Sequence, residues 1–110
     1  MASYFNKSTT VTVPVPRPVI IFNDMGLQDW KKTFIQLRDE ATESSDKQSY
    51  DKCYKTLLWG EFCNGTLSYV GNSKDKYGLT VKFTFQFTSF SCMVLFQKYR
   101  KHHLELVRMS

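Results

Sequence analysis

The sequence lacks the features typical of secreted, membrane-spanning and metal-binding proteins. Its cysteines, Cys53, Cys63 and Cys92, are odd in number and lack metal-ligand spacing, which argues against a disulfide framework and a zinc site. No apolar run approaches the ~18 residues that span a bilayer, and the first residues contain no signal-peptide core. We therefore expect a protein of the cytoplasm or nucleus that is not secreted and keeps its thiols reduced and buried.

Enzyme signatures are also missing. The chain has five glycines, and none of them forms a phosphate-binding loop or a serine nucleophile elbow. His102 and His103 are adjacent, so on a strand they would point to opposite faces and could not bind one metal ion. No catalytic acid pair stands out from the mixed charges of residues 23–60. The sequence therefore predicts no enzyme, no metal and no cofactor.

Acidic residues are the scarcer charge, since ten Asp and Glu stand against fifteen Lys and Arg, for a formal charge of +5. Residues 61–110 contain seven of the bases and three of the acids. Aromatic residues interleave with the bases at residues 96–103, where they could stack on nucleobases, sit at a lipid interface, or belong to an ordinary solvated turn. The residues predicted to bind nucleic acid or lipid headgroups are Lys74, Lys76, Lys82, Lys98, Arg100 and Lys101.

Residues 1–10 are small and polar, and we interpret them as a flexible N-terminal tail. A proline-interrupted apolar strip follows at residues 11–18, where proline excludes a central strand and leaves polyproline II or an edge strand. Such a stiff strip loses little entropy on docking, so it either packs on its own domain or enters a groove of a neighbouring copy. The predicted self-association residues are Val11, Val13, Pro14, Val15, Pro16 and Pro18.

Two helices are predicted in the first half of the chain. Apolar residues recur at steps of three and four over residues 25–42, preceded by the candidate N-caps Asn23 and Asp24. Residues 50–58 show the same spacing, with Gly60 placed as a C-terminal glycine, although residues 54–62 could instead begin a strand. The polar residues 42–49 between them lack an apolar anchor and are expected to form a solvated loop.

Strands are predicted over most of the remaining chain. Residues 79–88 alternate between apolar and polar, which indicates an antiparallel strand with one buried face. Further strands are expected at residues 19–22, 66–70 and 91–99, with a two-residue hairpin turn at Asn64-Gly65 and a second turn at residues 71–76. This order of elements predicts a single α+β domain over residues 11–110, an antiparallel sheet with one or two helices packed on one face.

The succession of motifs in residues 11–88 resembles the folded core of the rhabdovirus matrix proteins. The motifs are an initial strand, Asp24 opening a helix that carries Trp30, CYKTLLW at residues 53–59, CNGTLSYV at residues 63–70 and YGLTVKFTF at residues 77–85. The resemblance implies a non-enzymatic viral structural protein of the host cytoplasm or nucleus and the virion. Such a protein would form homo-oligomers, bind the viral nucleoprotein–RNA complex and meet an anionic membrane surface.

Two other functions are compatible with the same residues. A small basic nucleic-acid-binding viral accessory or regulatory protein, such as a silencing suppressor, would use the basic residues of the C-terminal half on its own. A pure protein-interaction module is the other possibility. Oligomerisation with vesicle binding would favour the matrix-like function, and tight binding of short RNA by a monomer would favour the regulator.

Overall fold

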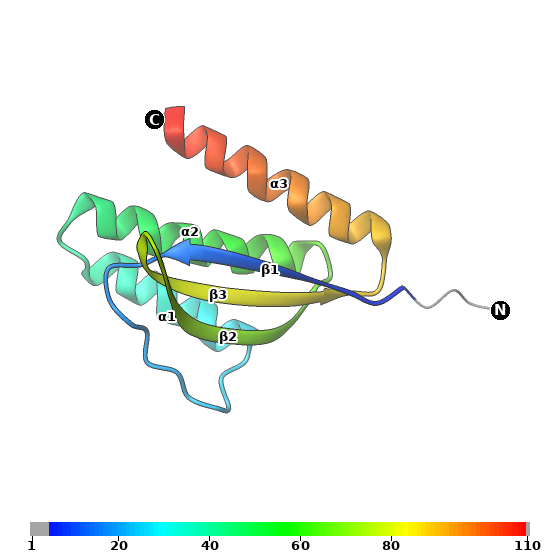
Figure 1. Cartoon of the computed structure of the whole chain (residues 1–110), viewed down its shortest axis with the longest axis horizontal. Coiled ribbons are helices and arrows are strands. Elements are labelled where there is room, and N and C mark those ends of the chain that lie inside the picture. The colour runs from blue at the N-terminus through cyan, green and yellow to red at the C-terminus, as the bar shows by residue number, and fades with distance from the viewer. Residues whose placement is uncertain (1–4, 110) are drawn as a thin grey trace.

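The alternating segment predicted at residues 79–88 forms the central strand of the sheet. The computed structural model describes the backbone of residues 5–109 and the side chains of residues 5–102. The elements follow one another as β1 (Lys7–Pro14), α1 (Leu27–Glu40), α2 (Ser44–Phe62), β2 (Thr66–Asp75), β3 (Gly78–Phe87) and α3 (Phe90–Met109) (Figure 1). They make one α+β domain, which confirms the predicted fold class, with three helices where one or two were expected.

Strand β3 lies between the other two strands, in the order β1-β3-β2, and pairs antiparallel with both. Val11 of β1 lies opposite Phe83, and Val70 of β2 lies opposite the same residue on the other side. Within the described residues, β1 and β2 are therefore edge strands with one neighbour each.

One face of the sheet is apolar, and the helices cover it. Three alternating phenylalanines of β3 are fully buried on this face: Phe83, Phe85 and Phe87. Phe34 of α1 contacts Phe83, with ring centroids 5.6 Å apart. Phe96 of α3 lies 5.3 Å from the rings of both Phe85 and Phe87. The core is thus an aromatic layer between sheet and helices, in which dispersion and apolar burial supply most of the stability.

Helix α1 confirms the amphipathic helix predicted at residues 25–42, with slightly shorter ends. Its apolar stripe buries Trp30 and Phe34 against the sheet. Gly26 is the N-cap, and its N–H donates to Asp29 Oδ2 at 3.1 Å. The predicted caps, Asn23 and Asp24, instead form a turn before the helix.

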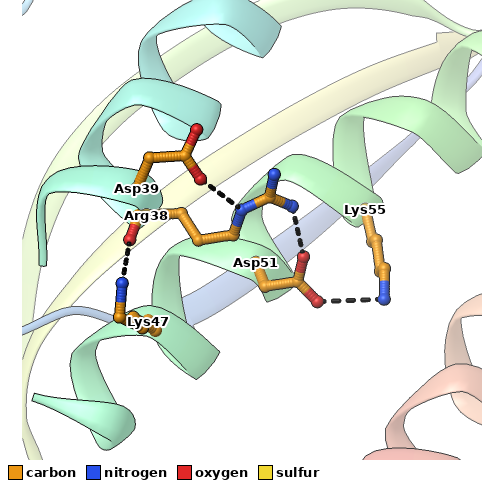
Figure 2. Close-up of polar contacts among 5 residues, drawn as sticks. All are labelled: Arg38, Asp39, Lys47, Asp51 and Lys55. Atoms are coloured by element: carbon orange, nitrogen blue, oxygen red, sulfur yellow. Dashed lines mark hydrogen bonds and ion pairs between the residues drawn. The ribbon is translucent and has the colours of Figure 1, made fainter.

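The solvated loop predicted at residues 42–49 is wrong, because α2 already begins at Ser44. An ion pair and a hydrogen bond between the two helices hold this first part of α2 in place (Figure 2). Arg38 Nη1 of α1 donates to Asp51 Oδ1 at 2.9 Å, and Lys47 Nζ donates to the Arg38 carbonyl at 3.3 Å. Lys55 Nζ lies 2.9 Å from the other Asp51 oxygen. Polar contacts with α1 therefore stabilise the start of α2, where the local sequence has no apolar residue to pack against the core.

The two-residue hairpin predicted at Asn64-Gly65 is also wrong, because these residues end α2. Gly65 N–H donates to the Gly60 carbonyl at 2.8 Å, and Asn64 N–H donates to the Glu61 carbonyl at 3.0 Å. This is the Schellman pattern, which needs a left-handed residue, and Asn64 supplies it with φ 60°. Gly60 lies inside the helix and is not the predicted C-terminal glycine.

The strand predicted at residues 19–22 and the turn predicted at residues 71–76 are both wrong. Residues 15–26 form a long loop between β1 and α1, whereas β2 continues to Asp75. The Asn72 side chain joins the two segments, accepting from Val19 N–H at 2.9 Å and donating to the Val19 carbonyl at 2.8 Å. One side-chain amide thereby satisfies the backbone groups that strand pairing would otherwise have to satisfy.

Helix α3 replaces the strand predicted at residues 91–99. Its inward side chains, Cys92, Met93, Phe96 and Tyr99, recur at helical spacing and pack on the core. The β-forming residues of this segment favoured a strand locally, but β3 has both edges occupied by β1 and β2. The helix continues to Met109, and the side chains of residues 103–109 fall outside the described residues.

The predicted tail is wrong for residues 7–10, which belong to β1, while residues 1–4 lie outside the described residues. The predicted edge strand of the proline segment is confirmed up to Pro14. Docking of its valines on a neighbouring copy is overturned, because Val11, Val13 and Val15 are at most 7% exposed in the core of their own domain. Their register opposite β3 turns them toward the aromatic layer, and only Pro14, Pro16 and Pro18 stay exposed.

Candidate functional site

The six predicted basic residues do not form one patch. Lys74 lies near the end of β2 and Lys76 in the turn that follows, and both are exposed. Lys82 is exposed on β3, where it alternates with the buried residues Val81 and Phe83. It therefore projects from the sheet face opposite to the helices. The sheet therefore separates Lys82 from the lysines of α3, whereas Lys74 and Lys76 lie at the turn between β2 and β3.

The basic residues of α3 differ among themselves in exposure. Lys98, Lys101 and His102 are exposed. Arg100 is half-buried, and burial lowers its pKa below the usual value for a guanidinium. Lys98 and His102 are one helical turn apart, on the same face of the helix. The side chain of His103 lies outside the described residues.

An aromatic cluster from α2 and α3 lies next to these cations. Its rings are Trp59 and Phe62 of α2 and Tyr99 of α3, which we call the α2–α3 aromatic cluster. The centroids of Trp59 and Tyr99 are 5.0 Å apart, and Phe62 meets both rings edge-on at 5.8 and 5.9 Å. Phe62 remains 65% exposed at the surface. A large exposed ring supported by two others is a platform on which a planar group can stack.

The basic-plus-aromatic segment predicted at residues 96–103 therefore contributes only part of this surface. Tyr99 belongs to the cluster, whereas Phe96 is fully buried in the core. Sequence reasoning missed Phe62, although a signal was present. Trp59 and Phe62 are three residues apart in a helix, so they share a face, and that face differs from the buried one that contains Leu57 and Gly60.

Positive charge borders the cluster on both helices. On α3 this charge is that of Lys98, which directly precedes Tyr99. On α2, Lys55 lies one turn before Trp59 and pairs with Asp51 at 2.9 Å. Asp51 therefore partly neutralises Lys55, so the positive charge beside the cluster comes mainly from the lysines of α3. This arrangement can attract a polyanion and offer its planar groups a ring to stack on.

The cysteines do not contribute to this surface. Cys53 and Cys63 are buried and Cys92 is half-buried, and all three are free thiols. Burial raises the pKa of both Cys53 and Cys63, which disfavours the reactive thiolate. Among the residues with described side chains, no three histidine, cysteine or acidic residues gather as a metal site would require.

Comparison of the chain with protein families, with curated proteins and with solved structures finds no match. The resemblance to the rhabdovirus matrix proteins therefore stays a prediction from the sequence motifs. In the part of the chain that the structure describes, no helix combines the length and the apolar character that crossing a membrane requires.

Proposed function

We propose that this chain is a non-enzymatic, viral matrix-like structural protein that binds the RNA of a nucleoprotein–RNA complex through the α2–α3 aromatic cluster and the neighbouring cations. The observation that carries the proposal is the exposed ring of Phe62, supported by Trp59 and Tyr99, with the exposed Lys98 directly before Tyr99 in α3. In such a protein the same chain also self-associates and meets an anionic membrane surface.

The physical basis is the combination of two weak, sequence-tolerant attractions. Lysine side chains release counterions from phosphates, which gives affinity that falls steeply with salt. An exposed aromatic ring adds about 1–3 kcal/mol for each base that stacks on it, without selecting among bases. A protein that coats nucleoprotein–RNA along its length needs such tolerance, because it cannot depend on one nucleotide sequence.

Binding of fluorescent single-stranded RNA across a salt series tests the role of the cations. We expect the double variant Lys98→Ala, Lys101→Ala to bind more weakly and to lower the slope of log affinity against log salt by about 0.7 for each phosphate that the variant no longer neutralises. A matched control, Lys7→Ala with Lys32→Ala, removes two exposed lysines elsewhere on the domain. Equal affinity and slope in all three proteins would refute this surface.

A second pair of variants tests the ring. Phe62→Ala should weaken RNA binding about tenfold or more at every salt concentration, since stacking does not release counterions. Phe90→Ala is its control, because Phe90 is 61% exposed but lies at the start of α3, against Phe5. Both variants should keep the parent's circular dichroism spectrum. Loss of affinity in the control alone would contradict the proposal.

A monomeric nucleic-acid-binding accessory protein, such as a silencing suppressor, is the second candidate. It is favoured by the burial of Val11, Val13 and Val15, which removes the self-association strip predicted from the sequence. Sedimentation velocity with and without anionic vesicles separates the two functions. Assembly that grows with concentration and on vesicles supports the matrix-like protein, and a monomer that binds short RNA tightly supports the accessory protein.

A further inference from the structure

The outer face of α3, turned away from the core, carries apolar side chains that remain exposed. Phe90 and Val94, one helical turn apart, are 61% and 41% exposed. Leu95, next to Val94, is 40% exposed. The helix runs along the outside of the domain (Figure 1). It therefore packs its inner face on the core and leaves a second, smaller apolar face in water, which is typical of an interaction surface.

Two lysines continue this row of apolar side chains along the helix. At about 100° per residue, positions 90, 94, 98 and 101 lie within about 80° of one another around the helix axis. Lys98 and Lys101 are both exposed. The row therefore begins with apolar side chains and becomes basic over the next two turns. We call Phe90, Val94, Leu95, Lys98 and Lys101 the outer α3 face.

Acidic residues are absent from this part of the sequence. Residues 76–104 contain no Asp or Glu. Two acids of the neighbouring helix α2 are engaged by other cations, since Glu61 pairs with Lys31 of α1 at 2.7 Å and Asp51 forms the ion pairs described above. Among the residues with described side chains, the two lysines of the outer α3 face form no ion pair. Their charge is therefore available to an anionic partner.

We propose that the outer α3 face binds an anionic lipid membrane, with Phe90 and Val94 between the lipid headgroups and the lysines on the phosphates. This inference rests on the proposed function, for which it names the surface that meets the membrane. A surface helix with an apolar strip and adjoining lysines lies in the plane of the membrane interface, where apolar burial and attraction to anionic lipid add together. Because the inner face of α3 stays packed on the core, binding does not require the helix to leave the domain.

The aliphatic side chains favour a membrane over RNA as the partner of this face. Val94 and Leu95 have no ring on which a base could stack, but they lose water on entering a lipid interface. Phe90 meets Phe5 edge-on, with ring centroids 5.8 Å apart, which positions the exposed ring at the start of α3. The lysines attract phosphates of either partner, so the apolar residues distinguish the two.

Co-sedimentation with vesicles tests the inference. Vesicles of two parts phosphatidylcholine to one part phosphatidylserine should bind the parent, and vesicles of phosphatidylcholine alone should bind it much more weakly. The double variant Phe90→Ser, Val94→Ser should weaken binding to the anionic vesicles about tenfold or more and leave the affinity for single-stranded RNA unchanged. The matched control, Ile20→Ser with Tyr77→Ser, removes two exposed apolar side chains elsewhere on the domain and should bind vesicles like the parent.

Phe62→Ala should show the opposite pattern, with weaker RNA binding and unchanged vesicle binding. Failure of the membrane contact and failure of the proposed RNA surface are therefore distinguishable. Circular dichroism checks the fold of each variant. The single variant Val94→Ser keeps the Phe5–Phe90 contact, so it provides the same test if the double variant does not fold.

Quenching of tryptophan fluorescence by brominated phosphatidylcholine in the anionic vesicles locates the contact. Val94→Trp should be quenched more than the parent, and Ile20→Trp should be quenched no more than the parent. Three results would overturn the inference: a parent that does not bind anionic vesicles, a double variant that binds them as well as the parent does, or one that loses RNA affinity to the same extent. In each case the RNA binding of Phe62→Ala still decides the proposed function, because it reads a different surface.

Discussion

The ring of Phe85 in β3 lies directly against the backbone of Gly60 in α2, and no room remains between them for a Cβ atom. Both residues are buried, so the ring cannot turn outward to make space. Glycine is therefore required here for close approach of helix and sheet, in a helix interior where it costs stability relative to alanine.

Gly60→Ala should accordingly destabilise the protein, by about 1–3 kcal/mol, because overpacking outweighs the better helix propensity of alanine. Gly26→Ala is the control, since a Cβ there has open space around it and a change at an N-cap position should cost less than about 1 kcal/mol. Urea denaturation of both variants measures the difference. A Gly60→Ala protein more stable than the parent would show that α2 can move away from Phe85.

Phe34→Ala should cost about 3–5 kcal/mol, because it removes buried apolar surface and leaves a residual cavity. Phe34 is fully buried between Trp30 and Phe83, with ring centroids 5.8 and 5.6 Å away. Phe62→Ala, at a ring that is 65% exposed, should cost much less. An unchanged denaturation midpoint for Phe34→Ala would contradict an aromatic core between α1 and the sheet.

Asp51 makes the α1–α2 contact dependent on pH (Figure 2). Burial alone would raise its pKa, but the hydrogen bonds from Lys55 and Arg38 outweigh burial and lower it. A folded-state pKa below the unfolded value of about 4 means that the stabilisation is present above pH 4 and is lost as the pH falls through the folded-state value.

Asp51→Asn should therefore be less stable than the parent at pH 7, and the difference should shrink progressively below about pH 4. Asp39→Asn is a suitable control, since Asp39 is 66% exposed and lies 3.4 Å from Arg38. Thermal denaturation at a series of pH values gives both curves. A difference for Asp51→Asn that does not vary with pH would mean that the carboxylate charge contributes nothing.

Asn72→Ala should release the loop between β1 and α1, because it removes both hydrogen bonds to Val19. We expect a loss of about 1–3 kcal/mol, from a partly buried N–H and carbonyl left without partners. Limited proteolysis should cut within residues 15–26 faster than in the parent. Ser73→Ala, at the next residue along β2, should leave the loop as protected as before.

The strongest local patterns gave correct predictions. Strict alternation over residues 79–88 determined β3, since period two can bury the phenylalanines only if the segment is extended. Apolar residues at steps of three and four likewise determined α1, with Trp30 and Phe34 on its buried face. In both segments the local preference and the tertiary environment agree, which is the condition for reading structure from sequence.

Local signals failed where distant residues decided the outcome. Asn64-Gly65 is equally compatible with a hairpin turn and with a helix end, because both need a residue with left-handed backbone. Here it forms a helix end, because α2 extends to Phe62. The apolar residues after Ser91 suit a strand, but the sheet offers them no free edge on β3. The ion pair between Arg38 and Asp51 and the hydrogen bond from Lys47 to the Arg38 carbonyl extended α2 into a polar segment that no local pattern marked.

The sequence by itself determined the fold class, the excess of positive charge and the burial pattern of α1 and β3, because periodicity and composition are local properties of the chain. Only the tertiary structure decided which residues meet at the surface. It turned Val11 and Val13 inward against β3, and it brought Phe62 of α2 beside Tyr99 of α3. Such proximity depends on how helices and strands pack across long sequence separations, and no local pattern specifies that packing.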